Sequence, residues 1–254
     1  MSTFPGRLLI IVALALVGLG GVCLAQVPLT DLPPRVIDCS PKPFAADVDA
    51  GLKQVTLTFD RPMTAANRSS IAPLRFMGLF PVTPNTQGAW DATGTILSLP
   101  VTLDTDVTYA LTLNASKDRG TTDAKGVPAL AFSWVFATGP RTPEDFPAYV
   151  VKCDPPMGAT DVDFGRKQIS VTFSRPVAPG DFSWVILRGS GEYPGGRNAG
   201  PPTLSADRLT ATMDVRLSPD TVYALEVNDV AYFGYKDTKG RPVLPFGWCF
   251  KTQK

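Results

Sequence analysis

Two pairs of aspartates are the residues whose spacing most resembles a ligand-binding site. Asp47 and Asp49 stand just before a glycine, and so do Asp161 and Asp163. Side chains two residues apart on an extended segment share a face, so each pair could offer carboxylate oxygens to a calcium ion. The further acids of an EF-hand loop are missing, and aspartates before a glycine commonly cap backbone N–H groups. We therefore interpret both pairs as turns and expect neither a metal nor a cofactor.

None of the 254 residues is histidine, which restricts the catalytic and metal-binding functions that the protein could have. Histidine is the side chain whose pKa lies near neutrality, and it is a common ligand of zinc and copper. Without it, Ser-His-Asp and Cys-His catalysis and histidine-ligated metal sites are excluded. No feature singles out a carboxylate pair suited to glycoside hydrolysis. The sequence thus predicts a protein that is not an enzyme and has no catalytic residues.

Charge and composition describe a neutral, globular chain. It has 24 basic and 23 acidic side chains, 22 glycines, 25 prolines and a hydrophobic fraction of 44%. The hydrophobic fraction is too high for a disordered chain, and the glycines and prolines fit many turns between short strands. A neutral protein lacks the positive field that attracts nucleic acid, so we expect no nucleic-acid partner.

The chain repeats itself at an offset of 114 residues. The stretch DVDAGLKQVTLTFDRPM begins at Asp47, and DVDFGRKQISVTFSRPV begins at Asp161. The same register holds near the end of each copy, where Phe132, Trp134 and Phe136 fall on Phe246, Trp248 and Phe250. A period this long indicates duplication of a whole domain rather than a solenoid. We place the domains at residues 35–140 and 148–254, with proline-rich joints before each.

Hydrophobic alternation predicts β-strands in both copies. In QVTLTF and QISVTF every second residue is apolar, which is typical of a half-buried strand. The segments TYALTL and VYALEV alternate in the same way, and each copy ends in a strand with aromatic residues at alternate positions. Helical periodicity is hard to find after residue 25. Many short strands separated by turn residues favour an all-β fold of two antiparallel β-sandwiches.

Residues 1–25 predict export. Arg7 precedes an apolar run from Leu8 to Leu19, and small residues follow up to Ala25. This is the pattern of a signal peptide cleaved after Ala25. A retained membrane anchor and lipidation of Cys23 are the alternatives; the apolar run is short for a membrane span. We expect the mature chain to lie in the periplasm, at the cell surface or outside the cell, with no membrane span.

Three cysteines remain in the mature chain, and an oxidising compartment would allow two of them to pair. Cys153 and Cys249 would lie in the first and last strands of the second domain, which are often neighbours. Cys249 stands between inward-facing aromatic residues and therefore points outward, which opposes such a bond. The sequence leaves this disulfide open. It predicts that Cys39 is a small buried residue, with an intermolecular bond as the alternative.

Several motifs in a fixed order resemble a known family. They are V-x-x-C-x-P, GATDVD, ISVTFSRPV, TVYALEV, KDTKGRPV and WCFKT in the second copy. Together they resemble the bacterial Ig-like domain named for the S-layer protein SbsA. The first copy departs from this pattern at KPFAADVD, where Phe44 replaces the expected glycine. The resemblance implies two tandem Ig-like domains of a kind that serves as spacer, scaffold or adhesive module. The similar CopC-type copper carriers bind copper through histidines, which this chain lacks.

The second copy carries aromatic residues that the first copy lacks. Tyr232, Phe233 and Tyr235 correspond to Asp118, Arg119 and Thr121, and the second copy also has Phe182 and Trp184. Core positions should stay apolar in both copies, so these rings are candidates for a ligand or partner surface. We prefer the alternative that they cover their own loop or seal the contact between the domains.

The function expected from these features is that of an exported, non-enzymatic Ig-like protein of the bacterial cell envelope. Its role would be structural, or adhesive and binding, with cell-wall polysaccharide or an envelope protein as the partner. The alternative is a secreted carbohydrate-binding module that uses the aromatic residues of the second domain.

Overall fold

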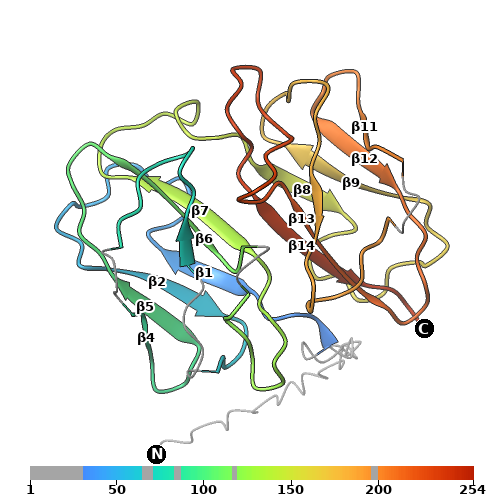
Figure 1. Cartoon of the computed structure of the whole chain (residues 1–254), viewed down its shortest axis with the longest axis horizontal. Helices are drawn as coiled ribbons and strands as arrows, with labels where there is room; N and C mark the ends of the chain where they lie inside the picture. Colours follow the sequence, from blue (N-terminus) through green and yellow to red (C-terminus); the bar gives the residue numbers. More distant parts are fainter. Residues whose placement is uncertain (1–30, 65–70, 83–86, 116–118, 196–199) are drawn as a thin grey trace, which may run out of the picture.

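The computed structural model describes residues 31–64, 71–82, 87–115, 119–195 and 200–254. These residues form fourteen strands, arranged as two β-sandwich domains side by side (Figure 1). Within them we find no helix of the length and hydrophobicity needed to cross a membrane. The predicted signal peptide, residues 1–25, lies outside the described residues.

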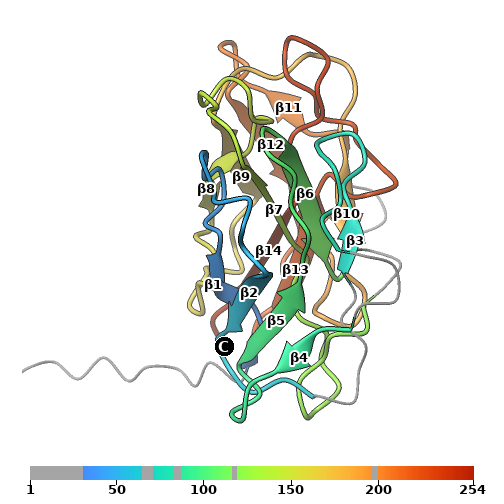
Figure 2. The same cartoon turned by 90° about the vertical axis from the view of Figure 1, so that its left-hand side faces the viewer.

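Each domain packs a four-stranded sheet against three further strands. In the first domain the four-stranded sheet has the order β1-β2-β5-β4, and β3, β6 and β7 lie in the facing layer (Figure 2). These strands are β1 (Val36–Ser40), β2 (Gln54–Phe59), β3 (Ile71–Pro73), β4 (Ala89–Trp90), β5 (Ile96–Pro100), β6 (Thr108–Leu113) and β7 (Phe132–Ala137).

The second domain repeats this arrangement. Its four-stranded sheet has the order β11-β12-β9-β8, and β10, β13 and β14 face it. These strands are β8 (Val150–Asp154), β9 (Gln168–Phe173), β10 (Trp184–Ile186), β11 (Thr203–Leu204), β12 (Thr210–Asp214), β13 (Val222–Val227) and β14 (Phe246–Lys251).

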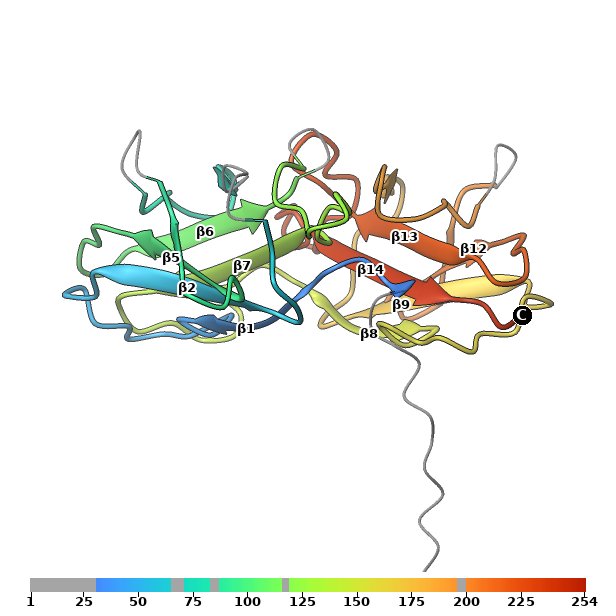
Figure 3. The same ribbon diagram turned by 90° about the horizontal axis from the view of Figure 1, so that it is seen from below.

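The facing layers of the two domains join into one six-stranded sheet of order β10-β13-β14-β7-β6-β3. Strands β7 and β14 meet antiparallel at a single residue pair, Phe132 with Phe246. Figure 3 shows these two strands at the centre of the molecule, with β1 and β8 on either side. Because the paired positions are equivalent in the two repeats, the domains are related by an approximate twofold axis at this point.

The alternating residues predicted to face inward form the two cores. Val55, Leu57 and Phe59 on β2 are at most 2% exposed, and the indoles of Trp134 and Trp248 are fully buried. Each core is also fixed by a tyrosine at the start of its penultimate strand. Tyr109 Oη accepts a hydrogen bond from the Asp104 N–H at 2.6 Å, and Tyr223 Oη accepts one from Ser218 at 2.7 Å. This is the tyrosine corner of Ig-like sandwiches.

The chain changes sheets after the first strand of each domain. Beyond β1, Phe44 N–H donates to Val135 O on β7, and beyond β8, Gly158 N–H donates to Cys249 O on β14. Both residues have a positive φ, 63° for Phe44 and 76° for Gly158. Glycine adopts this conformation without strain, whereas phenylalanine does so at a cost. The ring of Phe44 offsets that cost by stacking on Tyr149, with centroids 4.2 Å apart.

Candidate binding surface

The aromatic residues singled out in the second repeat separate into two groups. Tyr235 is 1% exposed, and its hydroxyl accepts a hydrogen bond from Trp184 Nε1 at 2.7 Å. Trp184 in turn lies 6.1 Å from the ring of Trp248 in the domain core. Burial raises the pKa of Tyr235 above its ordinary value. Of the candidates for a ligand surface, Tyr235 is therefore not exposed to a ligand but belongs to the core of the second domain, and Trp184, which is partly buried, packs against that core.

The remaining rings lie at the surface, and one pair of them joins the two domains. Tyr232 is 61% exposed, and the partly buried ring of Phe233 meets Phe76 of the first domain edge-on at 5.7 Å. Phe76 itself is 75% exposed, and Phe182 is 47% exposed. We call Phe76, Phe182, Tyr232 and Phe233 the aromatic patch. The contact between Phe233 and Phe76 agrees with the expectation that part of this cluster seals the domain boundary.

The loop that carries Tyr232 and Phe233 is held by its own hydrogen bonds. Asp229 Oδ1 accepts from the N–H groups of Ala231 at 2.6 Å and Tyr232 at 2.8 Å. A side chain at Gly234 would collide with the backbone of Phe182, so glycine allows the two segments to touch. Aromatic side chains on an ordered backbone lose little conformational entropy when they bind a partner.

The equivalent contact on the other side of the twofold axis is polar. Phe76 and Phe233 correspond, at the 114-residue offset, to Ser190 and Arg119. Arg119 Nη2 donates hydrogen bonds to Ser190 Oγ and to Ala129 O. Burial lowers the pKa of Arg119 to about 10. The two repeats thus use related positions for one aromatic and one polar contact between the domains, and only the aromatic side presents exposed rings.

The paired aspartates form turns, as expected. Asp49 Oδ1 accepts a hydrogen bond from Gly51 N–H at 2.8 Å, and Asp163 Oδ1 accepts one from Gly165 at the same distance. Asp47 has a φ of 53°, which places it in a tight turn. Within the part of the chain that the structure describes, no group of three or more acidic, cysteine or histidine side chains could hold a metal ion.

The three described cysteines are free and buried. The disulfide that the sequence left open is not formed. Cys153 on β8 packs in the core of the second domain, whereas Cys249 on β14, in the other sheet, packs in a separate cluster with Leu130 and Leu187. Cys39 is a small buried residue, as predicted. Burial raises the pKa of Cys39 and Cys249 to about 12 and that of Cys153 to about 11.

These thiols are expected to be unreactive in the folded protein, because thiolate is the reactive form and burial suppresses it. Adding dithiothreitol should leave the melting temperature unchanged. Iodoacetamide should modify Cys39, Cys153 and Cys249 only after unfolding in urea, as read by peptide mass spectrometry. A peptide cross-linked through Cys153 and Cys249 from the non-reduced protein would contradict this expectation.

Comparison with known proteins identifies the family. A model of the bacterial Ig-like domain matches residues 30–138 and again residues 145–252. The chain therefore belongs to the bacterial Ig-like domain family and contains two copies in tandem, as the sequence motifs indicated. Domains of this family are generally non-catalytic.

Similarity to individual known proteins is low. Curated protein sequences yield no match. Among solved structures, the S-layer protein SbsC is similar at 12% identity with a TM-score of 0.28, over 88% of this chain and 26% of that one. InvD of Yersinia pseudotuberculosis is similar at 10% identity with a TM-score of 0.23, over 88% of this chain and 58% of that one. This chain thus spans about a quarter of the S-layer protein, and TM-scores this low carry no functional conclusion.

Proposed function

We propose that this protein is an exported, non-enzymatic component of the bacterial cell envelope that binds a partner through the aromatic patch. Membership of the bacterial Ig-like family and the signal-peptide pattern of residues 1–25 support the location. The lack of histidine and of a metal-binding cluster among the described residues supports a role without catalysis. The partner is a cell-wall polysaccharide or another envelope protein.

The observation that carries this proposal is the exposure of the patch. Phe76 and Tyr232 keep 75% and 61% of their surface in contact with solvent, although apolar rings are ordinarily covered. Aromatic residues gathered on an ordered surface commonly mark binding sites, where they contribute much of the affinity. Because Phe76 comes from the first domain and Tyr232 from the second, a partner on the patch would contact both repeats.

A second candidate function is that of a secreted carbohydrate-binding module. Two exposed rings, Tyr232 and Phe182, belong to the second domain alone and lie on adjoining segments. The faces of such rings are suited to stacking on the apolar faces of sugars. On this alternative the second domain would bind glycans by itself, and Phe76 would be dispensable.

Co-sedimentation with cell-wall preparations and with insoluble polysaccharides tests both candidates. The wild-type protein is expected to pellet with the cell walls, and the Phe76→Ala/Tyr232→Ala variant is expected to lose at least about tenfold in affinity. The matched control is Ile37→Ala/Val151→Ala, which removes exposed side chains from β1 and β8. It should pellet like the wild type.

The outcomes separate the candidates. Binding to polysaccharide that is lost in Tyr232→Ala, retained in Phe76→Ala and displaced by soluble oligosaccharide would favour the carbohydrate-binding module. Loss of binding in either single variant supports a partner that contacts both domains; displacement by soluble glycan would make that partner a cell-wall polysaccharide, and no displacement would make it an envelope protein. Equal pelleting of the wild type and the double patch variant would contradict a binding role for the aromatic patch.

A further inference from the structure

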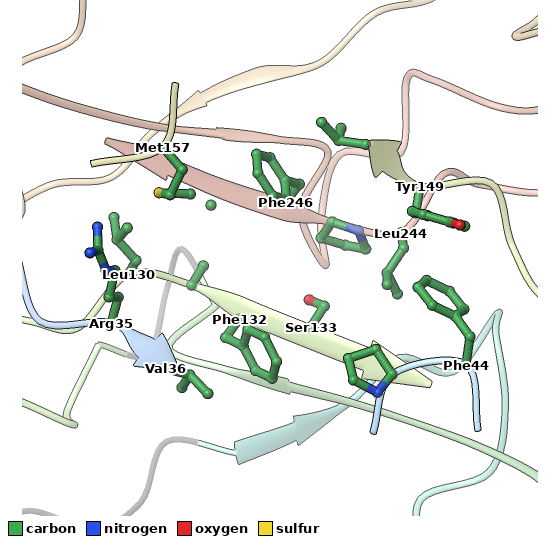
Figure 4. A pocket seen from close by; sticks show the side chains of 15 residues that line it. Arg35, Val36, Phe44, Leu130, Phe132, Ser133, Tyr149, Met157, Leu244 and Phe246 are labelled. Carbon is green, nitrogen blue, oxygen red and sulfur yellow. The ribbon is translucent and has the colours of Figure 1, made fainter. Parts of the chain in front are cut away.

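A largely apolar cavity of about 270 Å³ lies where the two domains meet (Figure 4). Equivalent residues of the two repeats line it in pairs: Val36 with Val150, Leu130 with Leu244, and Phe132 with Phe246. The last pair is also the single point at which β7 and β14 are joined. The cavity therefore lies at the approximate twofold axis, and it shares no lining residue with the aromatic patch.

The approximate twofold axis between the domains would make the two ends of this cavity equivalent, but their residues differ. At one end the ring of Tyr149 stacks on Phe44, with an angle of 30° between the ring planes. The equivalent positions at the other end hold Arg35 and Gly158. A side chain at Gly158 would collide with Arg35 Nη1, so the guanidinium occupies the space that a second ring would take. Figure 4 shows Arg35 beside Leu130 and Met157, far from Phe44 and Tyr149.

The charge of Arg35 is only loosely paired within the protein. Its Nε lies 3.8 Å from Asp60 Oδ2, which is beyond hydrogen-bond range. Asp60 makes its shorter bonds with Arg61, at 3.0 Å from Nε and 3.2 Å from Nη2. Arg35 is the one charged residue among the described residues that line the cavity. The cavity thus has one cationic end and one aromatic end, joined by apolar walls.

We propose that this cavity binds a carboxylate with an unbranched aliphatic tail. The carboxylate accepts hydrogen bonds from the Arg35 guanidinium, whose fork of N–H donors matches two carboxylate oxygens. The tail lies along Phe132 and Phe246 toward the stacked rings of Phe44 and Tyr149. An apolar cavity of about 150 Å³ holds benzene, so this larger one suits a chain of about ten carbons.

Isothermal titration of the full chain with decanoate, decanol and acetate tests the assignment. Decanoate is expected to bind saturably at one site, and decanol and acetate at least about tenfold more weakly, since each lacks one of the two recognised groups. The Arg35→Gln substitution should lower the affinity for decanoate at least about tenfold and leave the affinity for decanol unchanged. Absence of saturable decanoate binding, or equal affinity of wild type and Arg35→Gln for decanoate, would overturn the proposal.

Two tryptophan variants of β8 locate the site. Val150 lines the cavity, whereas the next residue, Val151, is 53% exposed and is not among the lining residues. Val150→Trp should fill the cavity and abolish decanoate binding, and Val151→Trp should bind like the wild type. Undiminished binding by a folded Val150→Trp protein would place the ligand elsewhere. If circular dichroism shows that Val150→Trp does not fold, the comparison of Arg35→Gln with decanol decides the matter alone.

Discussion

Replacing Asn228 with alanine is expected to lower the free energy of unfolding by about 3 to 5 kcal/mol. The Asn228 side chain is fully buried at the end of β13. Its Nδ2 donates to Tyr235 O and to Val243 O, each at 2.9 Å, and its Oδ1 accepts from Tyr235 N–H at 2.9 Å. Alanine would leave Tyr235 N–H and Val243 O buried without a partner, each costing about 1 to 3 kcal/mol. Tyr235 O would keep its hydrogen bond from Val243 N–H at 3.0 Å.

The backbone of Asn228 adds to this cost. Its φ is 56°, in the left-handed region that asparagine tolerates better than alanine. Asn114 makes the equivalent three contacts in the first domain, with a φ of 51°. Asn114→Ala should therefore lower the free energy of unfolding by a similar amount. Urea denaturation followed by tryptophan fluorescence measures both, with the exposed Tyr232→Ala as control. A loss below about 1 kcal/mol in Asn228→Ala would contradict this account.

Replacing Glu226 with glutamine is expected to stabilise the protein at neutral and alkaline pH. Glu226 lies on β13 between Val185 and Gly247, is 1% exposed, and its Oε2 has no hydrogen-bond partner. Burial raises its pKa well above the ordinary value of 4.5; the charge of Asp229 raises the pKa further, and Arg119 opposes this rise. The folded state therefore holds a proton that the unfolded chain releases more readily.

The direction in which stability changes with pH follows from the higher pKa of Glu226 in the folded state than in the unfolded state. The contribution of Glu226 to stability is fully present below about pH 4.5 and is lost as the pH rises through the higher folded-state pKa. Glutamine keeps the shape of the side chain and carries no proton to lose. Glu226→Gln should match the wild type near pH 4 and exceed its free energy of unfolding by about 1 to 3 kcal/mol at pH 8.

Urea denaturation of both proteins between pH 4 and pH 9 measures this difference. The matched control is Asp214→Asn, which removes an exposed carboxylate from β12. This variant should follow the wild-type pH dependence, because the carboxylate that it removes lies at the surface and not in the core. A Glu226→Gln protein with the same slope of stability against pH as the wild type would show that Glu226 is not the titrating group.

The domain fold could be predicted because its signals are local and occur twice. Alternation in QVTLTF places Val55, Leu57 and Phe59 on one face wherever that strand lies, since successive side chains of a strand point to opposite sides. The structure buries these three residues as expected. Loops do not have this regularity. In VAYFGYKD the sequence does not distinguish which of the three aromatic rings is buried and which are exposed. Asn228 decides among them, because its side chain holds the backbone of Tyr235 and directs that ring into the core.

The sequence by itself determined two copies of an Ig-like sandwich, their inward residues, the aspartate turns and the absence of histidine chemistry. Only the tertiary structure decided how the copies meet. Phe132 pairs with Phe246, and Phe76 contacts Phe233. At one end of the cavity between the domains, Arg35 packs against Gly158 where the other end has two stacked aromatic rings. The physical reason is that strand periodicity records which face of an element is buried, but not which distant surface covers it. Contacts between domains depend on complementary shape across residues far apart in the chain, and no local pattern carries that information.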